Sequence, residues 1–512
     1  MNRRLSWLRL SVGALLCIAG AWGLSRARPA EKSIVLGDAC QTPARVLGPD
    51  TRSAPVALVF HGFAASAAIM EPLGQSLAEA GWRVYLLDLA GHGRSRVPFS
   101  YARVDRCAVA AAQFLQRSGV LVPRRAIYVG HSLGAAAVIH LAGVLPAAAT
   151  VAISPALVVP PERTPPNLLV LAGQLDLGPV RKTARQLLRD AGGTRENPED
   201  FAAGRAVALG ILSGELHGTM VLDPRTWRRT LGWAGHALAP GAPRPATSGF
   251  NFVLPLAALF SSCALLAGMA FLVGPALTAM ADLFRLDPSR QTTVNESRGS
   301  GVAWKTTLVQ WAVAAFCAVS LVGLSRIDQF VRPTRLEDGD WTALVAFLTG
   351  LILLILLGRA VGKEWAPNPR WLNFALIAGV VLVALFSWAL RPELVQSSLS
   401  GARLWRWADM AVFICPYFLA EEAALGPPGR KNRVLMFLAM RGLLFLAEVF
   451  AVLVFWPSGL LIALLAIGLG IISIGQRLAA DALRRRGADV AAAAILDAIL
   501  AAGTLALILP LI

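Results

Sequence analysis

The segment Gly130-His131-Ser132-Leu133-Gly134 gives the clearest indication of the fold of the N-terminal half of this chain. It follows a strand-like run at residues 126–130 (AIYVG) and leads into helical text at residues 134–143 (GAAAVIHLAG). A turn from strand to helix is sharp and strained, so a Cβ at either flanking glycine would clash. The pattern therefore predicts a serine hydroxyl held at the carboxyl edge of a sheet.

Strand and helix signals alternate on both sides of this stretch. Short apolar runs rich in Val, Ile and Leu alternate with segments of helical spacing, which is typical of a mostly parallel sheet with helices on both faces. The predicted strands are residues 54–60, 83–88, 126–130, 149–154, 167–172 and 206–212, and the predicted helices are residues 66–80, 103–118, 134–143 and 222–238.

Two polar residues follow predicted strands in the order that a serine nucleophile requires. A serine is a weak nucleophile, so it needs a base, and the base needs an orienting acid. Asp176 comes after a strand in the segment GQLD, and His217 comes after the next strand in ELHG. Asp190 and Asp200 are alternative acids, but they follow helical or loop text rather than a strand. Ser132, Asp176 and His217 are therefore the predicted catalytic residues.

Two backbone N–H groups are placed to stabilise a developing oxyanion. Leu133 directly follows the serine, at the start of a helix, and Phe63 lies in a loop that follows an earlier strand. Oxyanion donors come from these two places in this type of turn. His61 and His131 belong to the same two backbone motifs, so we expect them to be structural rather than catalytic.

Together these segments resemble the α/β-hydrolase superfamily, in its esterase, lipase and serine-aminopeptidase-like branch. The resemblance covers about residues 33–240 and rests on HGF at 61–63, DLAGHGRS at 88–95, GHSLG, GQLD and ELHG. It implies Ser132 as nucleophile, Asp176 as acid and His217 as base. It also implies hydrolysis of an ester, thioester or amide, which requires no cofactor. A metal site is not expected, because the sequence has no cluster of His and Cys residues.

The connection at residues 155–166 is short and contains PPERTPP. Many lipases of this superfamily insert a helical lid here, and no lid fits in this stretch. We therefore expect a cleft that is open, or covered by a membrane, and a substrate that is bulky or associated with the bilayer.

The composition excludes several other classes of protein. Of the 512 residues, 56% are hydrophobic and only 15% are charged, which is too apolar for a disordered or fibrous chain. The net charge of +17 suggests nucleic acid as a partner. However, no basic run interleaved with aromatic residues occurs, and many arginines flank apolar segments, where they act as topology signals.

The apolar residues are concentrated at the N-terminus and in the C-terminal half. Residues 1–28 are typical of a signal anchor or signal peptide, because three arginines precede a short apolar run. Residues 250–512 are predicted to be an all-α transmembrane domain of about eight spans. The predicted spans are residues 251–275, 304–324, 341–359, 371–390, 407–425, 434–456, 458–476 and 488–510.

The loops of this predicted domain indicate an orientation. Alternate loops carry fourteen Lys and Arg residues against six in the others, and the richer set is expected to be cytoplasmic. The hydrolase-like domain would then be extracytoplasmic, in a multi-pass protein of the cell membrane. Cys40 and Cys107 belong to that domain, and one disulfide or two buried thiols are both compatible with the sequence.

Charged residues inside the predicted spans are candidate functional groups. Glu421-Glu422 loosely resembles the paired glutamates of CAAX-type intramembrane proteases, but no histidine follows His236 to complete such a site. We expect Glu421 or Glu422 to pair with Arg441 instead. Two alternatives to a membrane-anchored serine hydrolase remain open at this point. One is a non-catalytic sensor or binding domain attached to a transporter, and the other is an acyltransferase.

Overall fold

The computed structural model divides the chain into two compact units. It describes residues 3–27, 32–37, 39–156, 163–192, 200–238, 253–286, 367–390, 401–426 and 460–508, with shorter pieces within 347–355 and 433–442. One unit comprises Met1–Gly20, Cys263–Ala389 and Leu399–Leu507, and the other comprises Ala21–Ser262, Leu390–Ser398 and Ile508–Ile512. From the sequence we predict domains at residues 1–28, 33–240 and 250–512, and these boundaries remain predictions.

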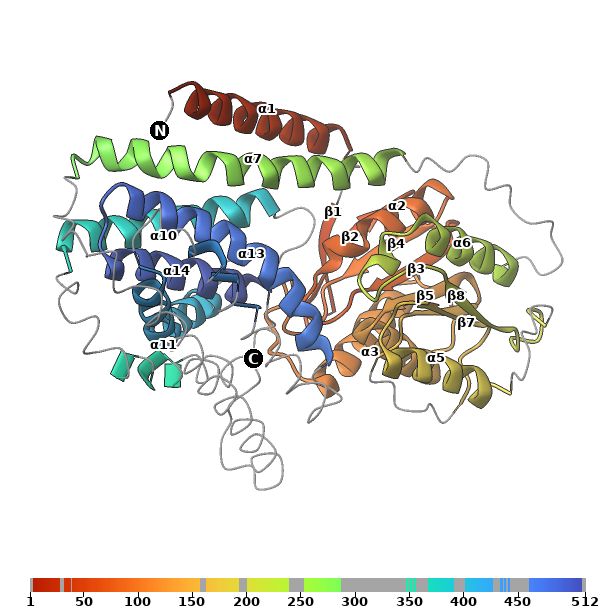
Figure 1. Cartoon of the computed structure of the whole chain (residues 1–512). Coiled ribbons are helices and arrows are strands. Elements are labelled where there is room, and N and C mark those ends of the chain that lie inside the picture. Colours follow the sequence, from red (N-terminus) through yellow and green to blue (C-terminus); the bar gives the residue numbers. More distant parts are fainter. Residues whose placement is uncertain are drawn as a thin grey trace. The chain divides into compact units, whose positions relative to one another are not determined.

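The second unit is built on an eight-stranded sheet with the order β1-β2-β4-β3-β5-β6-β7-β8 (Figure 1). Strand β2 pairs antiparallel with β1 and with β4, and every other pair is parallel. The prediction of a mostly parallel sheet is therefore confirmed. The strands are β1 (Lys32–Leu36), β2 (Thr42–Leu47), β3 (Val56–Phe60), β4 (Arg83–Leu87), β5 (Ala126–His131), β6 (Ala149–Ile153), β7 (Leu168–Gly173) and β8 (Val207–Leu212).

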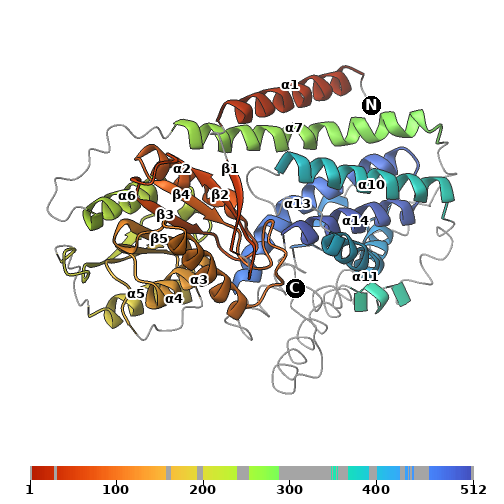
Figure 2. The same cartoon turned by 180° about the vertical axis from the view of Figure 1, so that it is seen from behind.

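Helices cover both faces of this sheet, as Figure 2 shows from behind. Helices α2 (Glu71–Glu79) and α6 (Pro224–Leu238) pack on one face. Helices α3 (Tyr101–Arg117), α4 (Leu133–Val144) and α5 (Gly178–Asp190) pack on the other. All residues of the central strands β3, β5, β6 and β7 are buried, which explains why they read as continuous apolar runs.

Three elements of this unit were not predicted. Strand β2 contains Pro43, which removes a ladder donor and weakens the strand signal, although its residues are mostly buried between β1 and β4. Helix α5 has a strongly charged sequence that buries only Val180, Ala184 and Leu187, so its apolar stripe is narrow. Strand β1 is short and mostly exposed at the edge of the sheet.

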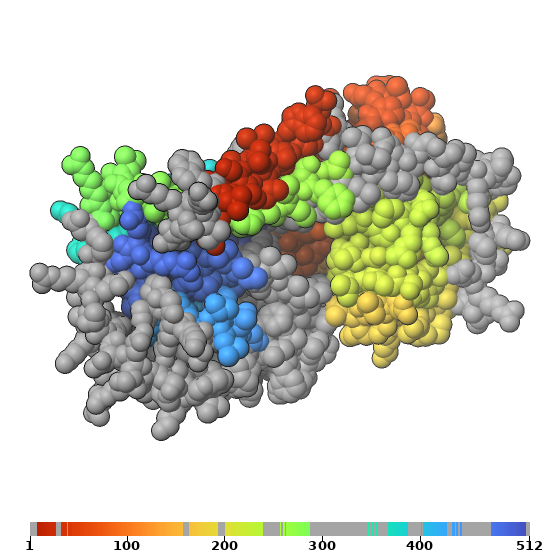
Figure 3. Space-filling model, turned by 45° about the horizontal axis from the view of Figure 1, so that its top comes forward, coloured from red at the N-terminus to blue at the C-terminus, as the bar shows by residue number. Residues whose placement is uncertain are grey.

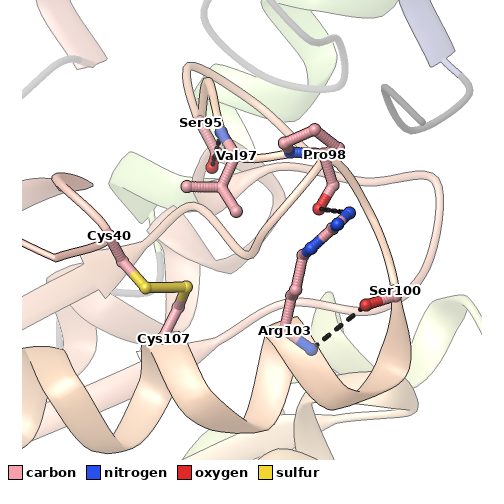
Figure 4. The surroundings of a disulfide bond; sticks show 7 residues. All are labelled: Cys40, Ser95, Val97, Pro98, Ser100, Arg103 and Cys107. Carbon is pink, nitrogen blue, oxygen red and sulfur yellow. Dashed lines mark hydrogen bonds between the residues drawn. A yellow bond between two sulfur atoms is a disulfide. The ribbon is translucent and has the colours of Figure 1, made fainter.

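A disulfide joins Cys40, in the turn between β1 and β2, to Cys107 of α3 (Figure 4). The two residues are 67 positions apart in sequence, and their Cα atoms are 5.5 Å apart. Close to this bridge, the side chain of Ser100 caps α3 by accepting a hydrogen bond from the backbone N–H of Arg103 at 3.3 Å. Of the two possibilities that the sequence left open, the structure has the disulfide.

Long helices account for the described C-terminal residues and for the N-terminal segment. They are α1 (Arg3–Ala27), α7 (Val253–Leu283), α10 (Pro369–Leu390), α11 (Gly401–Leu425), α13 (Leu460–Arg485) and α14 (Val490–Ile508). Helices α1 and α7 run side by side, with the thiol of Cys17 3.9 Å from the carbonyl oxygen of Leu265 (Figure 3). A buried cluster around Trp371 and Phe374 of α10 joins α7, α10, α13 and α14.

Four described helices are long and apolar enough to cross a membrane, and they are compatible with a membrane protein. These segments are Leu8–Arg26, Cys263–Leu283, Pro369–Ser387 and Val490–Leu507. Three of them overlap predicted spans of the C-terminal half. The predicted span 304–324 lies outside the described residues, as do large parts of 341–359 and 434–456.

Candidate active site

The register of the parallel strands brings four loops to one edge of the sheet. Phe60 is paired with Gly130, so the loops that follow β3 and β5 begin side by side. Gly173 is paired with Leu212, which aligns the loops after β7 and β8 in the same way. Because carboxyl ends of parallel strands share one edge, residues far apart in the sequence meet there.

Ser132 lies in the sharp turn between β5 and α4. Its backbone has φ 54° and ψ −112°, a left-handed conformation that is strained for any residue other than glycine. A Cβ at Gly130 would lie 2.1 Å from the carbonyl oxygen of Gly134, and a Cβ at Gly134 would lie 2.5 Å from that of Phe60. The two glycines are therefore required by close backbone approach, as the sequence predicted.

A continuous hydrogen-bond chain links the three predicted catalytic side chains. The Nε2 atom of His217 is 2.9 Å from the Oγ atom of Ser132, and its Nδ1 atom is 2.9 Å from Oδ1 of Asp176. Asp176 follows β7 and His217 follows β8, so the strand ends supply both residues. The side chains of Asp190 and Asp200, the alternative acids, bond to Gln186 and Arg205 instead.

The Asp176 carboxylate is held in its charged form although it is buried. Burial raises its pKa, but the hydrogen bond and the charge of His217 and a hydrogen bond from the backbone N–H of Leu177 at 2.7 Å bring the pKa below its usual value. Ser132, Asp176 and His217 are each at most 4% exposed. Part of the connection at 155–166 lies outside the described residues, so the expected open cleft remains a prediction.

Part of the chain is similar to known proteins. Residues 51–200 match the family of S33 serine aminopeptidases. A putative non-heme haloperoxidase of Mycobacterium phage D29 is 35% identical over 112 residues, which are 22% of this chain and 37% of that relative. The chain thus spans little more than a third of the relative's length.

Solved structures to which part of the chain is similar include three proteins from different organisms. TT1662 from Thermus thermophilus is 20% identical, with 41% of this chain and 99% of that chain covered and a TM-score of 0.31. The esterase Est2 of Thermogutta terrifontis is 16% identical (43% and 99% covered, TM-score 0.34). A monoacylglycerol lipase of Paleococcus ferrophilus is also 16% identical (38% and 99% covered, TM-score 0.30).

The matched family and the sheet topology lead to one conclusion. The chain contains an α/β-hydrolase domain. The family match also supports a serine-hydrolase-like function for this domain.

Within the hydrolase domain, the side chains of His61 and Asp88 form hydrogen bonds with backbone groups of the loops that surround the site. The Nδ1–H of His61 donates to the carbonyl oxygen of Gly62 at 2.7 Å, and its Nε2 accepts from the backbone N–H of Leu89 at 3.0 Å. Asp88 accepts hydrogen bonds from the backbone N–H groups of Ala67 and Arg94. Burial lowers the pKa of His61, so this histidine is neutral and serves to shape the loops.

The predicted oxyanion donors, Phe63 and Leu133, lie in the two expected places. Leu133 is the first residue of α4, immediately after Ser132. Phe63 follows β3, and its ring packs edge-on against His92 and Phe99 at centroid distances of 5.6 and 5.5 Å. Their role as donors remains a prediction.

His131 has a contact that the sequence did not indicate. Its Nε2–H donates a hydrogen bond to the backbone carbonyl oxygen of His217 at 3.0 Å, and the two rings lie 5.0 Å apart. Burial lowers the pKa of His131 to about 3, so it stays neutral at physiological pH. The two residues are 86 positions apart, and no local pattern signals such a contact.

Proposed function

We propose that the chain is a membrane-anchored serine hydrolase that cleaves an ester, thioester or amide through an acyl-enzyme on Ser132. The observation that carries this proposal is the hydrogen-bond chain from Ser132 through His217 to Asp176. A nucleophile, a base and an orienting acid in this order form the arrangement used in acyl transfer by serine enzymes. The strained backbone of Ser132 supports the same role.

In the first half of the reaction, the Oγ atom of Ser132 attacks the carbonyl carbon while Nε2 of His217 accepts the hydroxyl proton. Asp176 stabilises the imidazolium that forms. The backbone N–H groups of Leu133 and Phe63 would donate to the negative carbonyl oxygen, and the N-terminus of α4 favours negative charge there. The bond to the leaving group then breaks, and that group takes the proton from His217.

In the second half, water attacks the acyl group on Ser132. His217 accepts a proton from the water and returns it to the serine oxygen as the acyl–serine bond breaks. The products are a carboxylic acid and the free enzyme. Every proton in this cycle passes through His217, so a side chain of the protein itself carries out each proton transfer.

The membrane-anchoring part of the proposal rests on the long apolar helices. Segment Leu8–Arg26 of α1 exposes large apolar side chains, among them Leu15, Ile18 and Trp22, which need an apolar environment. The disulfide between Cys40 and Cys107 supports an oxidising, extracytoplasmic compartment for the hydrolase domain. A substrate in or near the bilayer fits such an anchor.

Turnover of chromogenic acyl esters by the full chain in detergent micelles tests the chemistry. We expect Ser132→Ala to abolish turnover, and Asp176→Asn to reduce kcat by about 10³- to 10⁴-fold, because the base loses its orienting charge. Asp190→Asn is the matched control, since this carboxylate lies at the end of α5 and bonds to Gln186. Full turnover by folded Ser132→Ala protein would refute the proposal.

The same assay separates the proposal from its two alternatives. A domain that only binds would bind its ligand equally well in the Ser132→Ala variant and would turn over no ester. An acyltransferase would divert product from the acid to a new ester when an alcohol is added, with the rate of leaving-group release unchanged or increased.

A further inference from the structure

A network of buried and partly buried charges lies among the helices of the C-terminal half, in a different compact unit from Ser132. It contains four carboxylates and four guanidinium groups, which come from α11, from residues 433–442, from α13 and from α14. Its members are Glu421, Glu422, Arg433, Arg441, Arg477, Asp481, Arg484 and Asp497.

Three of the four carboxylates have close partners. Glu421 accepts from Nε of Arg441 at 2.8 Å. Glu422 contacts Arg477 through Oε1 and lies 3.3 Å from Nη2 of Arg433 through Oε2. Asp481 is within 2.9 Å of nitrogen atoms of both Arg433 and Arg477. Each of these charges is therefore compensated, as a buried charge must be.

Asp497, the fourth carboxylate, has no such close partner among the residues that the structure describes. Its side chain is 1% exposed, and among the residues that the structure describes its Oδ1 atom has no hydrogen-bond partner. Its Oδ2 atom is 3.9 Å from Nη1 of Arg477, and that same nitrogen is already in contact with Glu422. The charges of Glu422, Arg441 and Glu421 also act on Asp497, and the two glutamates repel it.

A buried carboxylate without full compensation needs a cation. The described residues hold no group of three or more His, Cys, Asp or Glu side chains that could bind a metal ion. A proton needs only the one carboxylate, and binding it removes the cost of burying the charge.

We propose that Asp497 is a proton-binding site of the helical unit, the compact unit that contains α10, α11, α13 and α14. When the proton leaves, Arg477 is shared between Glu422 and Asp497. The proton comes from solvent water and returns to it, and no covalent bond other than the O–H bond changes. This inference goes beyond the serine hydrolase chemistry and does not depend on it.

The site adjoins a cavity of about 390 Å³. Leu500 and Thr504, three and seven residues after Asp497 on α14, line this cavity, and so does Gln476 of α13. Gln476 also accepts a hydrogen bond from Nη1 of Arg441 at 3.2 Å. A change of charge at Asp497 would therefore reach the wall of the cavity through Arg441 and Gln476. The helical unit would then respond to protons in addition to serving as an anchor.

Infrared spectroscopy of the purified full chain in lipid nanodiscs tests this site. At pH 7 we expect the carbonyl-stretch band of a protonated carboxyl group, present in the wild type and lost in Asp497→Asn. The band should disappear as the pH is raised. If the Asn variant does not fold, Asp497→Glu gives the same information, because the band of a glutamic acid is displaced from that of an aspartic acid.

Thermal stability provides the matched control. Asp497→Asn resembles the protonated residue, so its unfolding midpoint at pH 7 should stay within about one degree of the wild type. Glu422→Gln leaves Arg477 and Arg433 without a full counter-charge and should lower the midpoint by several degrees. Ester turnover through Ser132 should be unchanged in Asp497→Asn, so failure of the hydrolase proposal would be seen separately. An infrared spectrum at pH 7 identical in wild type and Asp497→Asn would overturn the inference, as would a loss of stability in Asp497→Asn equal to that in Glu422→Gln.

Discussion

The side chain of His131 donates a hydrogen bond to the backbone carbonyl oxygen of His217 at 3.0 Å. The residue just before the proposed nucleophile thus holds the loop that carries the proposed base. A Cβ on Gly62, in the loop after β3, would lie 2.9 Å from Nδ1 of His131 and 3.1 Å from Cβ of Ser132. His131 is therefore close to the loop that carries the predicted oxyanion donor Phe63, and it bonds to the loop that carries the base. It also directly precedes the nucleophile.

Loss of this contact should slow the chemical step. His131→Ala removes one buried hydrogen bond, worth about 1 kcal/mol, so we expect kcat for ester hydrolysis to fall roughly fivefold with little change in KM. His131→Gln keeps a side-chain donor and should restore part of the loss. Steady-state kinetics on both variants test this. A rise in KM at constant kcat would show that His131 acts on substrate binding and not on His217.

Acid should destabilise the hydrolase domain before its carboxylates are protonated. His61 and His131 have pKa values below the ordinary 6.5 in the folded state, that of His131 about 3, so the unfolded chain binds protons that the folded chain excludes. Their contribution to stability is complete above about pH 6.5 and is lost as the pH falls, at roughly 1.4 kcal/mol per pH unit for His131, and His61 acts in the same direction.

Urea unfolding of the full chain followed by tryptophan fluorescence between pH 7 and pH 5 measures this slope. Trp82, Trp227 and Trp233 are buried in the hydrolase domain and report its unfolding. We expect a shallower slope in His131→Gln, because one of the two histidines no longer titrates. Equal slopes in the two proteins would contradict the account.

Replacement by alanine should have opposite effects on stability at a glycine of the nucleophile turn and at a glycine near the far end of the same helix. Gly134→Ala places a Cβ 2.5 Å from a backbone oxygen of β3 and should cost about 3 kcal/mol. Gly143→Ala places a Cβ in open space within α4 and should stabilise by about 0.5–1 kcal/mol. Thermal unfolding of the two variants beside the wild type tests this, and equal midpoints would refute it.

The disulfide should make a large contribution to stability. Closing a loop of 67 residues contributes about 4 kcal/mol in the chain-entropy description. Reduction, or the double change Cys40→Ser and Cys107→Ser, should lower the unfolding midpoint of the hydrolase domain by roughly 10 °C. Cys263→Ser, at an exposed free cysteine, is the control that should have no effect. Labelling of Cys40 or Cys107 by a thiol reagent in non-reduced native protein would contradict the disulfide.

The parts of the fold that the sequence predicted are those with local signals. Strands β3, β5, β6 and β7 are continuous apolar runs because both faces are covered, and Ser132 is marked by its two glycines. Strand β2 was missed because Pro43 masks it, although β1 and β4 pair with it on both sides. The pairing predicted for Arg441 is confirmed with Glu421.

Other relationships depend on contacts between distant residues. Arg433 and Arg477 both contact Glu422 of α11, from positions 11 and 55 residues further along the chain, and nothing in this spacing indicates that they meet. The contact of His131 with His217 is of the same kind. Such contacts follow from packing of the whole unit, so only the folded structure reveals them.

An activated Ser132 nucleophile should react with a fluorophosphonate probe. Membranes that contain the wild type or Ser132→Ala would be labelled, and the modified peptide would be identified by mass spectrometry. We predict one adduct, on Ser132, in the wild type and none in the variant. Folded wild-type protein that takes up no probe, or equal labelling of the two proteins, would contradict the claim.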